Sequence, residues 1–473
     1  MGKTMSTRKV ELVIEAPTTL PTQNLHRSMK ILGTLLITLS AVSPASSVFI
    51  IIPGIVQTAG SGAFLSMILA AVIGVCMSLV YAELASAFPL TGGEYAIVGR
   101  LVGPLAGFIV LGVNTLSSIL IPAVFALGLS SYLTVLFPHL EAVPTAVVSV
   151  ILATLISTLN IRSNAVITGT FLVIEVLALV LLVVFGLVHV NRPITDLIFH
   201  PIMLGTNGLV RTPVGLIGMG VTIAIFAYNG YGSAVYFGEE MHDATKKIGH
   251  AILMALGITV LCELAPLTAV LLGAPDLKSL FGSSNMFGDF IASRAGSTMN
   301  TFISLGIALA IFNAMIACIL AAARMVFSTA RDNVWPLGID DLLVQTHPRF
   351  HSPHIATLLC GAFAVGACFV NETVLFVITG TGLVAIYAAI CYAVMLGRKQ
   401  RTTDHGHYRM PLFPLAPITA ILMLFYVIYA NWQDPVIGRP SLLTTLGVII
   451  ASAVYYLFVL RRKGAWVLRG PED

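Results

Sequence analysis

The apolar residues of this chain fall into long continuous segments separated by short polar stretches. A segment of about 20 apolar residues has the length that an α-helix needs to cross the hydrocarbon core of a bilayer. Twelve such segments predict an all-α polytopic membrane protein with about 12 transmembrane helices. The predicted spans lie at about 31–57, 63–88, 104–136, 144–160, 165–189, 213–238, 250–273, 298–323, 354–371, 373–397, 412–432 and 442–460.

The first span is interrupted near its middle, within residues 41–54. Ser43, Ser46 and Ser47 stand where a lipid-facing helix would carry Leu or Ile. Pro44 removes one backbone donor and disturbs the preceding turn. Backbone groups freed at membrane depth cost several kcal/mol each unless protein, water or a ligand satisfies them. The interruption therefore predicts either a packing kink or half of a binding site.

The sixth span carries a second interruption at residues 226–234, Phe-Ala-Tyr-Asn-Gly-Tyr-Gly-Ser-Ala. Gly230 and Gly232 favour local unwinding, and Asn229 brings an amide to membrane depth. Five spans run from each interruption, and an odd number of spans makes the two halves inverted relative to each other. Paired breaks at matching places in two such halves indicate the substrate site of a transporter.

The ends of broken helices suit a molecule with two charges. Half-helix N-termini attract a carboxylate, and the carbonyls at C-terminal ends attract an ammonium group, so an α-amino acid fits the pair.

The positions of the spans and breaks divide the chain into a cytoplasmic tail at 1–30, a first half at 31–189, a second half at 213–397, two further spans within 412–460 and a cytoplasmic tail at 461–473.

Composition and charge support a multi-pass protein of the cell membrane. Only 10% of the residues are charged and 57% are hydrophobic, whereas a soluble domain carries about 25% charged residues. Of the 25 Lys and Arg residues, 20 fall in segments that are cytoplasmic if both termini are inside. The basic residues beside the spans thus reflect topology and do not indicate nucleic-acid binding. The five predicted to lie outside are Arg192, Arg211, Lys278, Arg294 and Arg439.

Three motifs resemble those of the amino acid–polyamine–organocation (APC) superfamily, and the resemblance covers nearly the whole chain. They are Gly238-Glu-Glu followed by a basic segment up to Ile252, Phe88-Pro-Leu-Thr-Gly-Gly-Glu-Tyr95, and the run Arg324 to Asn333. The resemblance implies an amino acid permease with a LeuT-type five-plus-five inverted repeat and two further helices. In the first motif the usual prolines are replaced by Ala244 and Gly249.

The resemblance also implies which residues line the substrate cavity. The family's Gly-Ser-Gly motif in the first span corresponds to Ala45-Ser46-Ser47, which lacks both glycines, and the aromatic gate of the sixth span corresponds to Phe226. Gly232 stands where the family often has an acidic or amide residue, which argues against a second positive charge on the substrate. The expected substrate-binding residues are Ser43, Ala45, Ser46, Ser47, Val48, Phe49, Phe226, Ala227, Tyr228, Asn229, Gly230 and Asn313.

Glu175 lies in the middle of the fifth span, where an ionised carboxyl facing lipid costs at least about 2.5 kcal/mol. By resemblance its position is near that of a lysine which replaces a sodium ion in some family members. Two interpretations remain open for Glu175: a coupling group that carries a proton or a cation, or a buried hydrogen-bonded carboxyl. Sodium coupling is disfavoured because Ala317 and Cys318 stand where the family's sodium site has hydroxyls. For Glu263 in the seventh span a structural role is expected.

The predicted function is a secondary transporter of amino acids, with amino acids, protons and the lipid bilayer as its partners. No phosphate-binding loop, metal-ligand cluster or pair of catalytic groups is found in the sequence, so ATP-driven transport, a metal site, a cofactor and an enzymatic activity are not expected. Two alternatives remain: a carrier of polyamines or other amines, and a nutrient sensor without flux. The sequence leaves the oligomeric state unknown.

Overall fold

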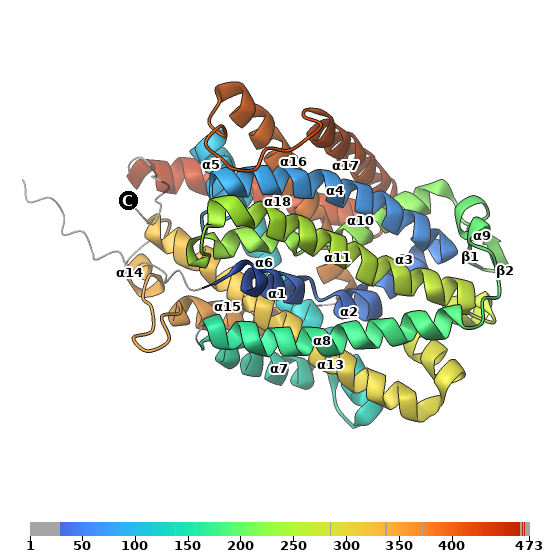
Figure 1. Ribbon diagram of the computed structural model, residues 1–473. Helices are drawn as coiled ribbons and strands as arrows, with labels where there is room; N and C mark the ends of the chain where they lie inside the picture. Colours follow the sequence, from blue (N-terminus) through green and yellow to red (C-terminus); the bar gives the residue numbers. More distant parts are fainter. Residues whose placement is uncertain are drawn as a thin grey trace, which may run out of the picture.

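The computed structural model describes residues 29–137, 139–159, 161–283, 285–335, 338–370, 372–463, 466 and 468. Most of the two predicted tails, 1–30 and 461–473, lies outside the described residues. Long helices run along one common direction, and the start of the first described helix at Ile31 and the last described helical turns at Arg461–Lys463 face the same end of the molecule (Figure 1). We call this the terminal end and the opposite one, which carries a small hairpin, the hairpin end.

The order of the elements along the chain is dominated by helices. The first half contains α1 (Ile31–Val42), α2 (Pro44–Ser46), η1 (Ser47–Ile51), α3 (Ile52–Ala59), η2 (Gly60–Gly62), α4 (Ala63–Ala87), α5 (Glu94–Leu101), α6 (Pro104–Leu136), α7 (Ala142–Ser157), α8 (Ile161–Leu187), α9 (Ile194–Phe199), β1 (Ile202–Gly205) and β2 (Gly208–Arg211). The second half contains α10 (Val214–Ala227), η3 (Tyr231–Glu240), α11 (Ala244–Gly273), α12 (Leu277–Gly282), α13 (Met286–Arg331), α14 (Ile339–Leu343), α15 (His354–Ala367), α16 (Glu372–Gln400), α17 (Leu415–Gln433), α18 (Gly438–Tyr455), η4 (Tyr456–Leu460) and η5 (Arg461–Lys463).

These helices confirm the predicted polytopic all-α class. Among the described residues, nine helical runs are long and apolar enough to cross a membrane, and the first of them, Ile31–Ala87, contains the first two predicted spans. The shorter apolar helices Ala142–Ser157 and His354–Ala367 fall on the predicted fourth and ninth spans. Each of the twelve predicted segments therefore corresponds to helix. The antiparallel pair β1–β2 caps the hairpin end and was not expected from the sequence.

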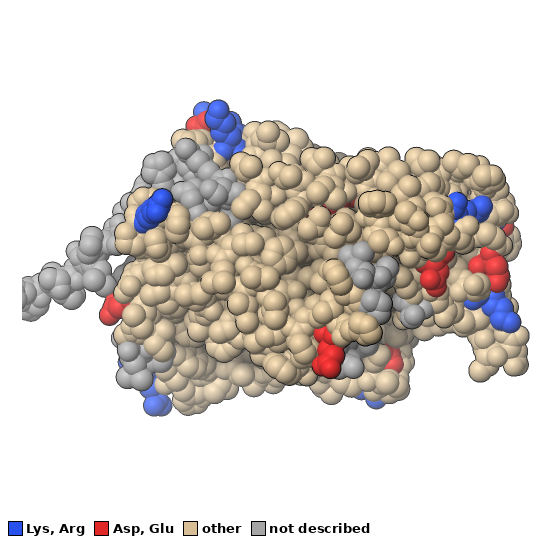
Figure 2. All heavy atoms as spheres, turned by 90° about the horizontal axis from the view of Figure 1, so that it is seen from below, with Lys and Arg blue, Asp and Glu red and all other residues tan. Residues whose placement is uncertain are grey.

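The outer surface matches a bilayer environment. Large apolar side chains such as Val173, Leu177, Leu422 and Phe425 are exposed along the helices. Figure 2 shows the blue Lys and Arg side chains mostly near the two ends of the molecule, with a broad tan surface between them. Such an apolar band is what lipid tails cover.

The predicted break in the first span is present. Helix α1 ends at Val42, and Ser43 takes a left-handed conformation (φ 44°) before the chain restarts as α2 at Pro44. The residue before a proline is driven away from the right-handed helical region, and proline is well suited to the first position of a new helix. The following turn, η1, is a π-helical turn, which rotates all later side chains around the helix axis.

The predicted break in the sixth span is present as well, and the two breaks touch. Helix α10 ends at Ala227, Gly230 has φ 117°, and the chain continues as the 3₁₀ segment η3. A Cβ atom at Gly230 would lie 2.9 Å from backbone atoms of Val42. Both the conformation and the close approach therefore require glycine at this position.

Candidate functional site

A cavity of about 90 Å³ lies where the two breaks meet. We call it the central cavity. Its wall combines the broken spans with α5, α6 and α13. Apolar side chains alternate there with hydroxyl, amide and carboxyl groups, as in most small-molecule sites. The lining residues used below are Ala41, Val42, Ser47, Ile51, Glu94, Asn114, Phe226, Ala227, Asn229, Gly230 and Tyr236.

The structure brings five of the residues predicted to bind substrate to the wall of this cavity and places the others beside or behind it. The five lining residues are Ser47, Phe226, Ala227, Asn229 and Gly230. The residues that do not line the central cavity are Ser43, Ala45, Ser46, Val48, Phe49, Tyr228 and Asn313.

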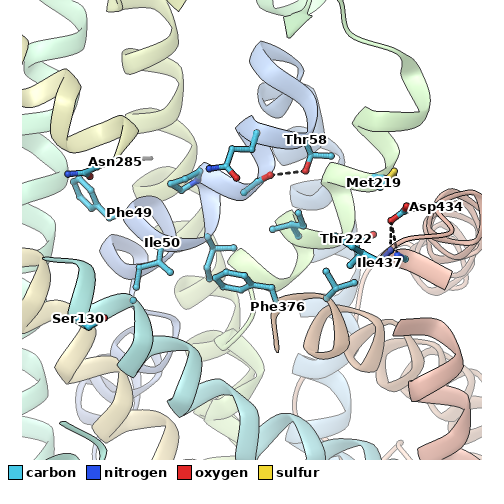
Figure 3. Close-up of a pocket in the computed structure, with 18 of the residues that line it drawn as sticks. Phe49, Ile50, Thr58, Ser130, Met219, Thr222, Asn285, Phe376, Asp434 and Ile437 are labelled. Carbon is cyan, nitrogen blue, oxygen red and sulfur yellow. Dashed lines mark hydrogen bonds between the residues drawn. The ribbon is translucent and has the colours of Figure 1, made fainter. Parts of the chain in front are cut away.

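A second, larger cavity of about 860 Å³ opens at the hairpin end (Figure 3). We call it the vestibule. Phe49 belongs to its wall, together with Thr58, Asn285 and Asp434. The hydroxyl of Tyr132 donates a hydrogen bond to the Phe49 carbonyl (2.5 Å), which fixes η1 against α6.

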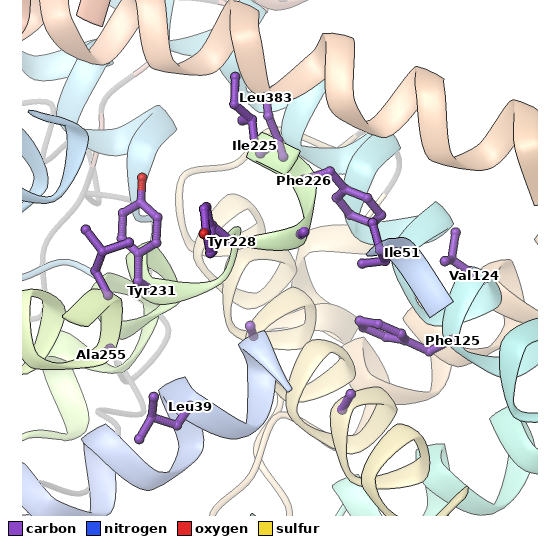
Figure 4. Packing of buried hydrophobic residues seen from close by; sticks show 14 of the residues in the cluster. Leu39, Ile51, Val124, Phe125, Ile225, Phe226, Tyr228, Tyr231, Ala255 and Leu383 are labelled. Carbon is purple, nitrogen blue, oxygen red and sulfur yellow. The ribbon is translucent and has the colours of Figure 1, made fainter. Parts of the chain in front are cut away.

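Only a thin apolar barrier separates the vestibule from the central cavity. Ile51 lines both spaces, Phe226 lines the central cavity, and Phe376 of α16 lines the vestibule. The ring centroids of Phe226 and Phe376 are 6.1 Å apart. Figure 4 shows Phe226 next to Ile51, with Phe125 below them.

A thick polar closure lies on the other side of the central cavity, toward the terminal end. Arg331 donates two hydrogen bonds to Glu239 (2.8 and 2.9 Å), and Arg324 donates one to Glu240 (3.0 Å). All four side chains are buried or nearly so. Removing one partner of a buried ion pair costs about 3–5 kcal/mol. The Gly238-Glu-Glu motif and the run after the eighth span are therefore parts of one closure.

Glu94 is a lining residue that was not predicted. It lies at the start of α5 and accepts hydrogen bonds from the hydroxyl of Tyr81 (3.0 Å), from the amide of Asn114 (3.2 Å) and from the hydroxyl of Tyr236. In the sequence Glu94 stands in the Phe88–Tyr95 motif, directly after two glycines. Its isolated carboxyl between apolar residues was the available signal.

Glu175 meets the first break from the side of α8 and α13. Its fully buried carboxyl accepts hydrogen bonds from the Ser43 hydroxyl (3.1 Å) and from the Asn313 amide (3.0 Å). The Ser43 hydroxyl also lies 2.6 Å from that of Ser46. Ser43, Ser46 and Asn313 therefore form one polar cluster with Glu175, behind the central cavity.

Comparisons with known proteins agree with this architecture. The family profile described as "Amino acid permease" matches residues 30–459. The chain is 25% identical to the methylthioribose transporter of Bacillus subtilis, over 86% of this chain and 88% of that protein. It is 25% identical to the branched-chain amino acid permease BcaP of Lactococcus lactis, over 86% and 89%. It is 24% identical to the mouse large neutral amino acids transporter small subunit 2, over 85% and 77%.

Proposed function

Because this chain belongs to the amino acid permease family, we propose that it is a secondary active transporter that moves amino acids by alternating access. The observation that supports this most is the unequal closure of the central cavity. Three apolar side chains separate it from the vestibule, whereas two buried ion pairs close it toward the terminal end. This is the arrangement expected of a carrier whose binding site is closed on both sides and opens more easily toward the vestibule. The terminal end is the cytoplasmic side in this proposal.

The chemistry of the cavity wall fits an α-amino acid. Ala41 and Val42 bring the C-terminal end of α1, whose last carbonyls carry partial negative charge and favour an ammonium group. Ser47 and Asn229 bring neutral hydrogen-bonding groups from the two breaks, and these suit a carboxylate. Phe226 closes over the bound molecule from the side of the vestibule.

The transport cycle requires the two barriers to open in turn. With substrate bound, Phe226 and Ile51 stay packed while the Glu239–Arg331 and Glu240–Arg324 pairs separate and the halves 31–189 and 213–397 rock as inverted repeats. Separation of the pairs exposes four charged groups to cytoplasmic water, which offsets part of the lost attraction.

Glu175, on α8, is the proposed coupling group. Its carboxyl accepts a hydrogen bond from the hydroxyl of Ser43, the residue at which the first span breaks. A change in its charge therefore alters the hydrogen bonds that hold the break. Such a link between charge and helix geometry is what proton coupling requires.

One observation favours an amine carrier as the second candidate. Glu94 places a carboxyl in the cavity wall, and a carboxylate suits an ammonium group. The relatives named above carry a methylthioribose, branched-chain amino acids or large neutral amino acids, so their names do not select one substrate.

Uptake of labelled amino acids into proteoliposomes tests the proposal. Amino acid transport predicts accumulation that is competed by neutral amino acids, whereas the amine alternative predicts competition by putrescine or ethanolamine instead. If neither amino acids nor amines are taken up or exchanged, with or without a pH gradient, the transport function is wrong.

A further inference from the structure

Glu263, in the middle of α11, has a completely buried side chain (0% exposed). Neither of its carboxyl oxygens has a partner of normal hydrogen-bond geometry among the described residues, although the Ser47 hydroxyl lies close enough to interact with the carboxyl. The hydroxyl of Tyr228, at the break of the sixth span, is also buried and lacks a partner, and it interacts electrostatically with Glu263. Buried polar groups are nearly always paired. Two neighbouring buried groups without partners therefore mark this place as a candidate binding site for a small ligand.

The surroundings of Glu263 leave its charge uncompensated. The elements packed against α11 include α1, α4, α8 and η3, and no Lys, Arg or His of the described residues contributes to the electrostatics of Glu263. The nearby titratable groups are Tyr228 and Cys262, and Cys262 interacts with both Glu263 and Glu175. An unpaired buried carboxylate costs several kcal/mol, so these surroundings favour the neutral, protonated form of the carboxyl.

Ser47 connects this carboxyl to the central cavity. It faces Glu263 from η1 and lines the cavity wall. Its hydroxyl donates a hydrogen bond to the carbonyl of Ala227 (2.9 Å), which joins the break of the first span to that of the sixth. A serine hydroxyl has one hydrogen. Ser47 can therefore bond to Ala227 or to an ionised Glu263, but not to both.

We propose that Glu263 is a proton-binding site whose charge decides whether Ser47 joins the two broken spans. The proposal rests on the transport function above. When the carboxyl O–H bond breaks, the proton passes to water in the cavity and the electron pair stays on Glu263. The hydroxyls of Ser47 and Tyr228 then turn to donate to the carboxylate, and the Ser47–Ala227 hydrogen bond opens. Substrate release and proton release are thereby linked.

The ligand assigned to Glu263 is a proton and not a metal ion because of the donor set. The side chains that interact with Glu263 are the hydroxyls of Ser47 and Tyr228 and the thiol of Cys262, whereas hard cations take about six or more oxygen ligands. A proton needs only one oxygen. The described residues also contain no cluster of three or more His, Cys, Asp or Glu side chains.

Infrared spectroscopy of the purified full-length protein tests this site without any transport assay. At neutral pH the wild type is expected to show the C=O band of a protonated carboxyl, and Glu263→Gln is expected to lose it. Glu141→Gln, at an exposed glutamate, is the matched control and keeps the band. If Glu263→Gln leaves all such bands unchanged, Glu263 holds no proton and the proposal is wrong.

Ligand binding at several pH values tests the link to the cavity. Protonated Glu263 keeps the Ser47–Ala227 bond, so the affinity for a substrate amino acid is expected to fall as the pH rises, by up to about tenfold per pH unit for one linked proton. Glu263→Gln should remove the part of this pH dependence that Glu263 contributes, so that affinity falls less steeply with pH than in the wild type, and Glu263→Asp should restore the wild-type slope. A wild-type thermal stabilisation by NaCl over choline chloride that Glu263→Gln abolishes would instead assign a sodium ion.

The two tests separate failure of this site from failure of the proposed function. If no amino acid binds or is taken up but the infrared band is lost in Glu263→Gln, the proton site stands and the substrate class is wrong. If uptake occurs and the band is unaffected, the transport function stands and Glu263 is structural.

Discussion

Two buried carboxyls meet the broken first span, Glu175 from α8 and Glu263 from α11, and they differ in their hydrogen bonds. Glu175 accepts hydrogen bonds from Ser43 and Asn313, whereas Glu263 accepts none from the described residues. Both side chains are 0% exposed, so burial alone does not distinguish them. The donors around a buried carboxyl, rather than its depth, therefore decide whether it can hold a charge.

The largest effect is expected at the point where both breaks meet. Gly230→Val places a β-branched side chain at φ 117° and within 2.9 Å of Val42, so the breaks can no longer pack together. Binding of the substrate amino acid should fall below detection in a thermal-shift assay. The matched control is the same substitution at another helical glycine, Gly257→Val, because a Cβ at Gly257 meets open space. Unchanged affinity in Gly230→Val would remove the contact of the breaks from the site.

Leucine substitutions of the two carboxyls should have opposite effects on stability. Glu175→Leu leaves the donors of Ser43 and Asn313 without their acceptor and should destabilise the protein by about 1–3 kcal/mol. Glu263→Leu removes an unpaired polar group from an apolar site and should leave the melting temperature equal or higher. The two melting temperatures, measured in the same detergent, check the comparison. Equal losses would mean that Glu263 has partners as good as those of Glu175.

Glutamine substitution of Glu175 addresses coupling rather than stability. Because Gln cannot titrate, Glu175→Gln should flatten the pH dependence of amino acid uptake while its side-chain oxygen still accepts one hydrogen bond. Initial uptake rates across a pH series give the readout. A profile identical to that of the wild type would leave Glu175 a structural residue.

The smallest effects are expected from the hydroxyls near the two carboxyls, Ser43 beside Glu175 and Tyr228 beside Glu263. Ser43→Ala removes a donor to Glu175 and should cost about 1 kcal/mol of stability. Tyr228→Phe removes a hydroxyl without a partner and should change stability by less than about 0.5 kcal/mol. Chemical or thermal unfolding of both variants provides the measurement. A larger loss in Tyr228→Phe than in Ser43→Ala would indicate that Tyr228 already donates to an ionised Glu263.

The sequence was sufficient for the spans and for both breaks, because long apolar segments, Pro44 and Gly230 act locally on the backbone. It was not sufficient for the positions of individual side chains. Phe49, predicted to bind substrate, lines the vestibule and not the central cavity, and the π-helical turn η1 rotates the residues that follow Ser46. The contacts of Glu175 with Ser43 and Asn313 join residues far apart in the chain, and no local pattern marks them.

Substrate-driven proton movement tests the central claim most directly. Proteoliposomes that enclose a pH-sensitive dye would receive an amino acid that binds in the thermal-shift assay, with no pH gradient imposed. Proton coupling at the broken spans predicts that the lumen acidifies as the amino acid enters, and that Glu263→Gln acidifies it less for each amino acid taken up. Uptake by the wild type with no change in the internal pH would contradict proton coupling.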